Sequence, residues 1–187
     1  MAGDECYAEF GWDEPWASAP IPSILDPRVV GDDHTDVLGV YSLSKQSNLA
    51  GYRAAFIAGD PVLIERLLTV RKHAGLMLPA PVQAAMIAAL GDETHVAEQR
   101  ERYRARRGIL RPALEAAGYR IDASEAGLYL WVTRGVDAWE DVARFADLGI
   151  VVGPGTFYGN GSPQHVRLST TATDAHITEA ARRISGE

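Results

Sequence analysis

The sequence predicts an α/β fold, because short β-rich apolar runs alternate with segments of helical periodicity along its 187 residues. VLGVY and GYRAAFIAG have the length and composition of strands, whereas the stretch that ends at Gly118 has the apolar spacing of a long helix. Hydrophobic residues make up 47% of the chain, which is enough for a core. No apolar run reaches the length of a membrane span, and MAGDECYAEF lacks the basic and apolar regions of a signal peptide. We therefore expect a cytoplasmic protein without a membrane partner.

The first part of the chain is expected to contain three strands and two helices. A strand ends near Asp4, VLGVY and GYRAAFIAG are the other two, and the proline-rich WDEPWASAPIPSILDPRVVGDDHTD is a surface connection between the first two. Asp60 and Pro61 are residue types typical of a helix N-cap and first helical position. The buried face of that helix is expected to consist of Leu63, Leu67 and Val70. A second helix is expected from about Pro81 to Gly91.

A long helix is expected from about Glu93 to Gly118. Its apolar positions repeat every seven residues, at Val96, Tyr103, Leu110 and Ala117. Its arginines recur at three- and four-residue steps, at Arg100, Arg104, Arg107 and Arg111. This pattern is typical of an amphipathic helix with a solvated basic face. A nucleic-acid patch is the alternative, but the net charge of −7 argues against a polyanionic partner, and we expect no nucleic acid.

After Gly118 the pattern changes to short strands and short helices, which predicts a small α+β domain. YRIDASEAGLYLWVT predicts two strands, and Trp139 to Leu148 predicts a helix that Gly149 closes. IVVGPGTFYG predicts a strand followed by a glycine-rich bend, and HVRLSTTA predicts a further strand. The last helix is expected to start at Asp174. GPGTFYGNG has the glycine density of a phosphate loop but lacks the Lys-Ser/Thr pair of a P-loop. We interpret it as a mobile segment on the substrate side of this domain, with an ordinary tight turn as the alternative.

Lys45 stands out among the candidate functional residues. It follows the apolar strand VLGVY, and its neighbours Ser42, Ser44, Ser47 and Asn48 favour a turn over a helix. The lysine is therefore expected at a strand end. An amine held beside buried apolar surface is costly to charge, so its pKa falls and it becomes available for Schiff-base chemistry. The alternative is a surface lysine whose aliphatic stem lies along the strand terminus.

Side chains upstream and downstream of this lysine suit the same chemistry. In DECYAEF, Asp4 and Tyr7 are three positions apart, so both can reach one flat ligand from a segment that leaves a strand. Arg53 presents a rigid fork of donors suited to phosphate, with Ser42 and Ser44 as hydroxyl partners. A pyridoxal cofactor needs a carboxylate at its ring nitrogen, a hydroxyl at its phenolic oxygen, and cationic or hydroxyl donors at its phosphate. By itself, D-x-x-Y is more often a solvated strand end.

DECY, SLSKQSNLAGYR and VRLS together resemble, in order and in spacing, the C-terminal part of class I/II pyridoxal-phosphate-dependent aminotransferases of fold type I. The resemblance covers essentially the whole chain, and QSNLAGYRAAF, RKHAGLMLPAPVQAAM and GPGTFYG are most similar to succinyldiaminopimelate aminotransferases of lysine biosynthesis. It implies a pyridoxal 5′-phosphate cofactor and a homodimer. It also implies an incomplete large-domain sheet in residues 1–92, followed by a linking helix and a small α+β domain in residues 93–187.

The resemblance assigns a role to each candidate residue. Lys45 forms the Schiff base with the cofactor and later moves a proton between the substrate α-carbon and the cofactor. Asp4 pairs with the ring nitrogen, Tyr7 bonds the phenolic oxygen, and the phosphate is held by Ser42 and Arg53. Arg167 in HVRLS binds the substrate α-carboxylate; an edge-strand arginine in solvent is the alternative there.

The implied activity is transamination between an amino acid and a 2-oxo acid, with glutamate as donor and an N-succinylated amino-keto dicarboxylate as acceptor. Members of the family have an N-terminal half that supplies the first strands, backbone donors for the phosphate and a ring stacked on the cofactor, whereas this chain starts at the ring-nitrogen aspartate. We therefore expect a truncated chain that is inactive alone and whose unpaired strands favour oligomerisation. The alternatives are a carbon–sulfur lyase on the same frame and a non-catalytic remnant or binding fragment.

No second catalytic constellation is apparent in the sequence. Cys6 is the only cysteine, which fits a reducing compartment, and we assign it to packing. The five histidines include no pair at i, i+4, so we expect no metal site.

Overall fold

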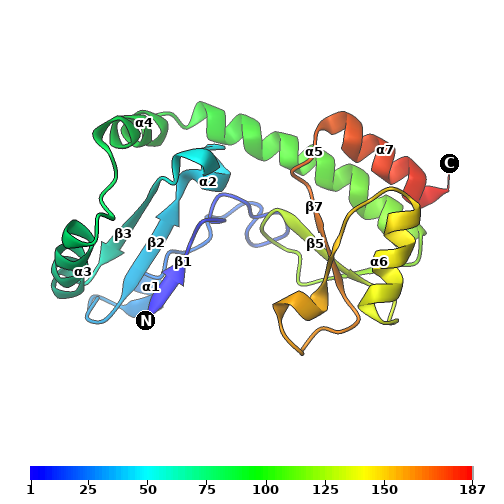
Figure 1. Ribbon diagram of the computed structural model, residues 1–187, viewed down its shortest axis with the longest axis horizontal. Helices are drawn as coiled ribbons and strands as arrows, with labels where there is room; N and C mark the ends of the chain where they lie inside the picture. Colours follow the sequence, from blue (N-terminus) through cyan, green and yellow to red (C-terminus); the bar gives the residue numbers. More distant parts are fainter. Residues whose placement is uncertain (187) are drawn as a thin grey trace. The chain divides into compact units, whose positions relative to one another are not determined.

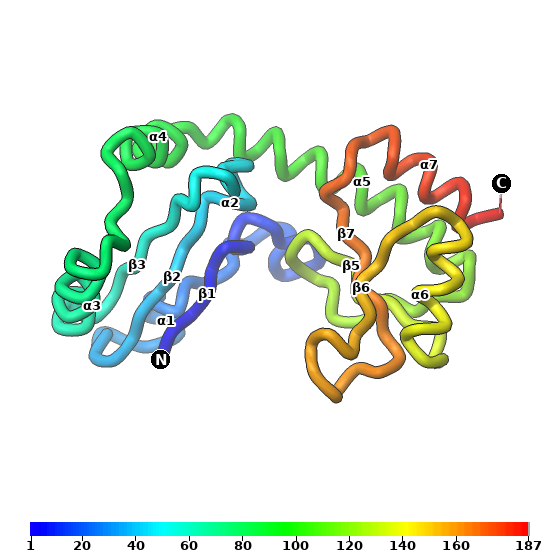
Figure 2. The backbone as a smooth tube through the Cα atoms, viewed as in Figure 1, coloured from blue at the N-terminus to red at the C-terminus, as the bar shows by residue number. Residues whose placement is uncertain are grey.

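The computed structural model describes residues 1–186, and these divide into two compact units, Met1–Arg100 and residues 101–186 (Figures 1 and 2). Each unit contains one β-sheet with helices, so the predicted α/β fold is confirmed. The change of unit falls inside a single long helix, close to the boundary after residue 92 that the sequence predicts; that boundary stays a prediction. Within residues 1–186, no helix combines the length and the apolar character needed to cross a bilayer.

The first unit is built on a three-stranded sheet of β1 (Ala2–Asp4), β2 (Leu38–Ser42) and β3 (Ala55–Gly59), in the order β1-β2-β3 (Figure 1). Strands β1 and β2 are parallel, with Asp4 opposite Val40, and β2 and β3 are antiparallel. The parallel pair requires a long connection, which runs over residues 5–37 and contains the short helix α1 (Pro27–Val30).

This connection is not only a surface segment, as the sequence suggested. Trp12 is buried and stacks on the fully buried Phe10, with ring centroids 6.0 Å apart. The carboxylate of Glu5 accepts hydrogen bonds from the Ser23 hydroxyl at 2.9 Å and the Ile24 amide at 2.6 Å. Aromatic burial and these bonds fix the segment against the sheet, which the proline content did not reveal.

Two helices follow β3: α3 (Pro61–His73) and α4 (Ala80–Leu90). The predicted start of α3 is confirmed, because the Asp60 carboxylate accepts from the amides of Val62 at 2.7 Å and Leu63 at 3.4 Å. The predicted buried face is wrong, because no residue of α3 is buried: Leu63 and Leu67 are half-buried, and Val70 is 63% exposed. The apolar side of α3 instead borders an open groove of about 490 Å³, whose lining includes Ile57, Leu67, Leu68, Met77 and Met86.

Helix α5 (Thr94–Ala116) confirms the long helix and its apolar seam, since Tyr103 and Leu110 are buried. The prediction that the basic face of this helix is solvated is wrong for two of its arginines. Arg107 is buried, and its guanidinium donates to the carbonyl of Ser124. Arg100 is half-buried and donates to the carbonyls of Gly11 at 3.1 Å and Ala17 at 3.2 Å. Charge spacing on a helix does not reveal such contacts, because they depend on distant backbone carbonyls.

The second unit is built on an antiparallel sheet in the order β4-β5-β7-β6, and Figure 1 labels its two central strands, β5 and β7. Its strands and the elements beside them are β4 (Arg120–Asp122), β5 (Tyr129–Thr133), α6 (Ala138–Asp147), β6 (Gly153–Pro154), the 3₁₀ helix η2 (Gly155–Tyr158), β7 (Val166–Ser169) and α7 (Asp174–Ser185). The strand predicted at IVVGPGTFYG shrinks to the two residues of β6, and Val151 is 98% exposed. The trace in Figure 2 shows the loop that leaves β6 and returns to β7.

Strand alternation separates the two faces of this sheet. Leu130 and Val132 of β5 and Val166 and Leu168 of β7 are buried against apolar residues of α5, α6 and α7. The residues between them, Tyr129, Trp131 and Arg167, therefore project from the opposite face.

A buried carboxylate ties β5 and α6 to the end of α5. Asp141 is fully buried, and its Oδ1 accepts from the Tyr119 hydroxyl at 3.0 Å and the Arg134 Nε at 2.6 Å. Burial, followed by the hydrogen bond to Asp141, raises the pKa of Tyr119 to about 12 from its ordinary 10.0. A buried charge is stable only where such donors surround it.

We expect Tyr119→Phe to destabilise the fold, because it removes one donor from the buried Asp141 carboxylate. The expected loss is about 1–3 kcal/mol of unfolding free energy, measured by chemical denaturation at pH 7. Tyr158→Phe is the matched control, since the Tyr158 side chain is 53% exposed. Equal stability of the two variants would contradict this role.

The same hydroxyl makes stability depend on alkaline pH. Unfolded Tyr119 loses its proton near pH 10, whereas the folded group keeps it up to about pH 12, so the unfolded state binds fewer protons in this window. Stability should therefore fall as the pH rises from 10 to 12. In thermal melts at several pH values, the melting temperature should fall less steeply with pH for Tyr119→Phe than for the original chain.

Candidate functional site

The sequence-predicted site residues lie in both units. Five of them, Asp4, Tyr7, Ser42, Lys45 and Arg53, belong to the first unit, and Arg167 belongs to the second.

Lys45 lies immediately after β2, in the four-residue helix α2 (Leu43–Gln46), rather than in the turn that its neighbours suggested. The helix forms because Ser42 is its N-cap: the Ser42 hydroxyl accepts from the Ser44 amide at 3.2 Å and donates to the Ser44 hydroxyl at 2.8 Å. Leu43, which is fully buried, anchors this helix to the core of the first unit. The side chain of Lys45 is half-buried, and its amine forms neither a hydrogen bond nor an ion pair within residues 1–186.

Asp4 and Lys45 both act on one side chain, the thiol of Cys6. Strands β1 and β2 run parallel, so their C-terminal ends lie at the same edge of the sheet. Asp4 is the last residue of β1, and Lys45 lies in the helix that directly follows β2. Burial, then the hydrogen bond with Asp4 and the charge of Asp4, raise the pKa of Cys6 to about 11, while the positive charge of Lys45 opposes that rise. The charges of the carboxylate and the amine therefore both influence the Cys6 thiol.

Tyr7 lies in the turn that leaves β1. Its carbonyl accepts from the Phe10 amide at 3.0 Å, and the Cys6 amide donates to Asp4 Oδ1 at 3.2 Å. Tyr7 is half-buried, whereas Asp4 is exposed. The turn thus keeps the phenol and the carboxylate within one short, hydrogen-bonded segment at the same strand end.

Arg53 closes the segment that begins at Lys45. It follows the short 3₁₀ helix η1 (Ala50–Tyr52) with a left-handed backbone, at φ 52°, and Asn48 shares this conformation at φ 54°. Non-glycine residues rarely adopt such angles, and the strain is typical of functional segments. The exposed guanidinium of Arg53 donates to the Ala50 carbonyl at 3.1 Å, which leaves further donors of its fork for a ligand.

The groups at this edge of the sheet fit pyridoxal phosphate by their chemistry. The amine corresponds to the aldehyde of that molecule, the carboxylate to its ring nitrogen and the phenol to its phenolic oxygen. The serine hydroxyl and the guanidinium both correspond to its phosphate. The Lys45 amine is not engaged with another side chain of residues 1–186, and Asp4 is exposed. Nothing in this donor set argues against the cofactor.

Arg167 is not an edge-strand arginine, because β7 lies between β5 and β6 in the sheet. Its guanidinium carbon lies 4.1 Å from the centroid of the Tyr129 ring and 5.0 Å from that of Tyr158. Within residues 1–186 the guanidinium forms neither a hydrogen bond nor an ion pair. A half-buried cation with unused donors is suited to binding an anionic group such as a carboxylate.

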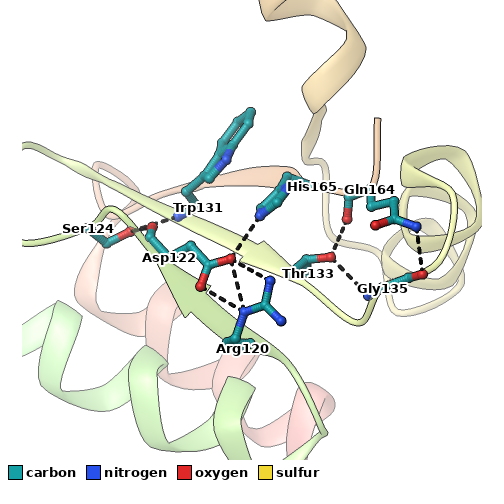
Figure 3. Close-up of polar contacts among 8 residues, drawn as sticks. All are labelled: Arg120, Asp122, Ser124, Trp131, Thr133, Gly135, Gln164 and His165. Atoms are coloured by element: carbon teal, nitrogen blue, oxygen red, sulfur yellow. Dashed lines mark hydrogen bonds and ion pairs between the residues drawn. The ribbon is translucent and has the colours of Figure 1, made fainter. Parts of the chain in front are cut away.

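The sequence motifs did not indicate the side chains that surround Arg167. Trp131 is its neighbour on β5, and the ring of His165 stacks on Trp131 with centroids 5.4 Å apart. Figure 3 shows His165 directed at Asp122, which it meets at 3.0 Å, and Asp122 also bound to Arg120. The period-two alternation of GLYLWVT gave a signal, because it places Tyr129 and Trp131 on one face.

The sequence matches the family described as aminotransferase class I and II over residues 3–184. It is 56% identical over 185 residues to the 4-dedimethylamino-4-oxo-anhydrotetracycline transaminase OxyQ of Streptomyces rimosus, a match that covers 99% of this chain and 50% of that protein. It is 53% identical to the probable aminotransferase Rv1178 of Mycobacterium tuberculosis, over 99% of this chain and 43% of the relative. The chain therefore spans about half the length of these curated relatives.

Solved structures give the same result. An aminotransferase from Neisseria meningitidis superposes with a TM-score of 0.87 at 30% identity, over 99% of this chain and 48% of the other. A probable N-succinyldiaminopimelate aminotransferase from Thermus thermophilus superposes with a TM-score of 0.84 at 27% identity, over 99% and 49%. The resemblance inferred from the sequence motifs and the fold type that it implies are confirmed.

The thiol of Cys6 provides a direct test of this site, because it is the only cysteine. The rate of alkylation by iodoacetamide, followed by mass spectrometry, should rise with a midpoint near pH 11 rather than 9.0. Asp4→Asn should lower that midpoint and Lys45→Gln should raise it, because the two charges act on the thiol in opposite directions.

The matched control is Lys72→Gln, the other lysine of the chain, which should leave the midpoint unchanged. If Lys45→Gln and Lys72→Gln behave alike, Lys45 does not lie beside Cys6.

Proposed function

Because this chain belongs to the class I and II aminotransferases, a family that uses pyridoxal phosphate, we propose that it provides the lysine-bearing part of an aminotransferase active site. The observation that carries the proposal is that the parallel strands β1 and β2 end at the same edge of the sheet, with Asp4 at the end of β1 and Lys45 in the helix directly after β2. A carboxylate and an amine at one strand end are the two protein groups that this chemistry most requires.

Each residue has a role in this proposal. When bound, pyridoxal phosphate supplies an electron-accepting ring that makes the α-proton of an amino acid removable. The Nζ atom of Lys45 would hold the cofactor and, as a free amine, would accept the α-proton and return it. Asp4 would accept a hydrogen bond from the ring nitrogen and keep it protonated. Tyr7 would donate to the phenolic oxygen, and the Ser42 hydroxyl and the Arg53 guanidinium would bind the phosphate.

Arg167 binds the α-carboxylate shared by the amino donor and the product oxo acid. Its planar fork matches both oxygens of a carboxylate, so it fixes the orientation of the substrate as well as its charge. Orientation matters because a small displacement of the α-carbon from the proton-accepting amine lowers the rate steeply.

We propose glutamate as the amino donor and an N-succinylated amino-keto dicarboxylate of lysine biosynthesis as one acceptor. Support comes from the probable N-succinyldiaminopimelate aminotransferase of T. thermophilus, at 27% identity. LL-diaminopimelate aminotransferases add to it, for example that of Aquifex aeolicus, which is 32% identical over 98% of this chain and 47% of its own length.

A ring ketone is the second candidate acceptor. Its support is the 56% identity to OxyQ, whose name describes a transaminase of an oxo-anhydrotetracycline. The aromatic side chains beside Arg167, Tyr129 and Tyr158, are consistent with a flat substrate. A carbon–sulfur lyase and a non-catalytic fragment are the remaining alternatives.

We further propose that the whole protein is a cytoplasmic homodimer, which the family resemblance and the single thiol support. In that assembly, residues 1–92 belong to the cofactor-binding domain and residues 93–187 to the linking helix and small domain.

The cofactor assignment predicts a specific covalent label. After addition of pyridoxal phosphate and reduction with borohydride, peptide mapping should find the pyridoxyl group on Lys45 in preference to Lys72, the only other lysine. Lys72→Arg should leave the label in place, and Lys45→Arg should remove it. Equal labelling of both lysines would mean that the amine of Lys45 is not in a specific site.

The activity is tested in a chimera in which this chain replaces the matched part of the probable aminotransferase Rv1178. Glutamate-dependent amino transfer should be present with an N-succinylated oxo-dicarboxylate or with a ring ketone, and comparison of kcat/KM for the two identifies the acceptor class. Lys45→Ala should abolish transfer, and Lys72→Ala should not. Elimination of thiol from cystathionine without amino transfer would favour the lyase, and a folded chimera with neither activity would favour the non-catalytic fragment.

In the same chimera, Arg167→Lys should raise the KM for donor and acceptor together, by about tenfold or more. A lysine keeps the charge but cannot form the bidentate pair with a carboxylate that both substrates share. If only one substrate is affected, Arg167 recognises a side chain and not the common carboxylate.

A further inference from the structure

The guanidinium of Arg167 is held by aromatic rings where an ion pair would be expected. Its central carbon lies 4.1 Å from the Tyr129 centroid and 5.0 Å from the Tyr158 centroid. The faces of these rings attract a cation without using its N–H groups as donors. The charge is therefore stabilised while the edge of the guanidinium plane keeps its hydrogen-bonding capacity.

The nearest acidic residue in the same cross-strand row is already neutralised. The row runs from Asp122 through Trp131 and Arg167 to Gly153. Asp122 accepts from Arg120 Nε at 2.8 Å and meets His165 Nε2 at 3.0 Å (Figure 3). These two partners, Arg120 first, hold the pKa of the Asp122 carboxyl well below its usual range. Asp122 is thus committed to other cations, and Arg167 has no competing carboxylate in its row.

The Tyr158 ring is braced in its position. Trp131 meets it edge to face, with centroids 5.6 Å apart and an interplanar angle of 78°. Trp131 is in turn stacked on His165 at an angle of 9°. A Cβ atom at Gly153 would lie 3.4 Å from the Tyr158 hydroxyl, at ordinary contact distance, so the end of the Tyr158 side chain lies beside β6. These contacts restrict where the ring, and with it the guanidinium beside it, can lie.

We propose that Tyr158, together with Tyr129, is a positioning residue that presents Arg167 as a preformed receptor for a planar carboxylate. The inference rests on the proposed role of Arg167 in substrate binding. A guanidinium whose charge is stabilised by ring faces keeps two parallel N–H groups in its own plane, which match the two oxygens of a carboxylate.

The test uses the full 187-residue chain with ¹⁵N-labelled arginine, titrated with L-glutamate and followed by NMR at the Arg167 Nε–H. In the original chain this resonance should lie upfield, because of the ring currents of the two tyrosines, and should move on addition of glutamate. Tyr158→Leu should remove most of the upfield shift and weaken glutamate binding by about threefold to tenfold. Tyr158→Phe, which keeps the ring, should restore both.

Tyr52→Leu is the matched control, because Tyr52 and Tyr158 are equally exposed, at 53% each, and Tyr52 lies in the first unit. It should change neither the resonance nor the affinity.

The outcomes separate this inference from the role proposed for Arg167. If glutamate binding survives Arg167→Gln, the proposed role itself is wrong. If Arg167→Gln abolishes binding but Tyr158→Leu matches the original chain, the role stands and the positioning inference is overturned. Should Tyr158→Leu not fold, an Arg167 resonance without an upfield shift in the original chain overturns the inference.

Discussion

The parallel pairing of β1 with β2 is the constraint on which the candidate cofactor site depends. It places Asp4 opposite Val40 and continues through the bond from the Glu5 amide to the Val40 carbonyl, at 2.8 Å. Because parallel strands end at the same edge of a sheet, the turn that carries Cys6 and Tyr7 meets the short helix that carries Lys45. In a different strand register, the Asp4 carboxylate and the Lys45 amine would not both act on the Cys6 thiol.

A parallel pair needs a long return path, and the chain uses close contacts to pack it. A Cβ atom on Gly3 would lie 3.1 Å from Ile24, so glycine lets the connection lie close to the sheet. Gly11 leaves no room for a side chain, since a Cβ atom there would lie 2.1 Å from the carbonyl oxygen of Trp16. Phe10 and Trp12 then add apolar burial, which fixes the segment that follows the Asp4 turn.

The second unit uses a different constraint, the alternation of side chains along β5 and β7. The same backbone that buries Leu130, Val132 and Leu168 against three helices exposes an aromatic and cationic face on its other side. That face stays available because neither α5, α6 nor α7 packs its apolar residues there. Core and candidate substrate site are thus two consequences of one strand periodicity.

The sequence by itself determined the α/β class, the N-cap of α3 at Asp60, the long helix and the residues that carry the family resemblance, because these depend on neighbours along the chain. Cap chemistry and helical periodicity are local, and so they survive without tertiary information. Only the tertiary structure decided that Arg107 is buried on a distant carbonyl, that Val70 remains exposed, and that Arg167 lies against tyrosine rings. Each of these depends on strand pairing and helix packing between residues far apart in the sequence. A sequence pattern does not give the distance between such residues in space.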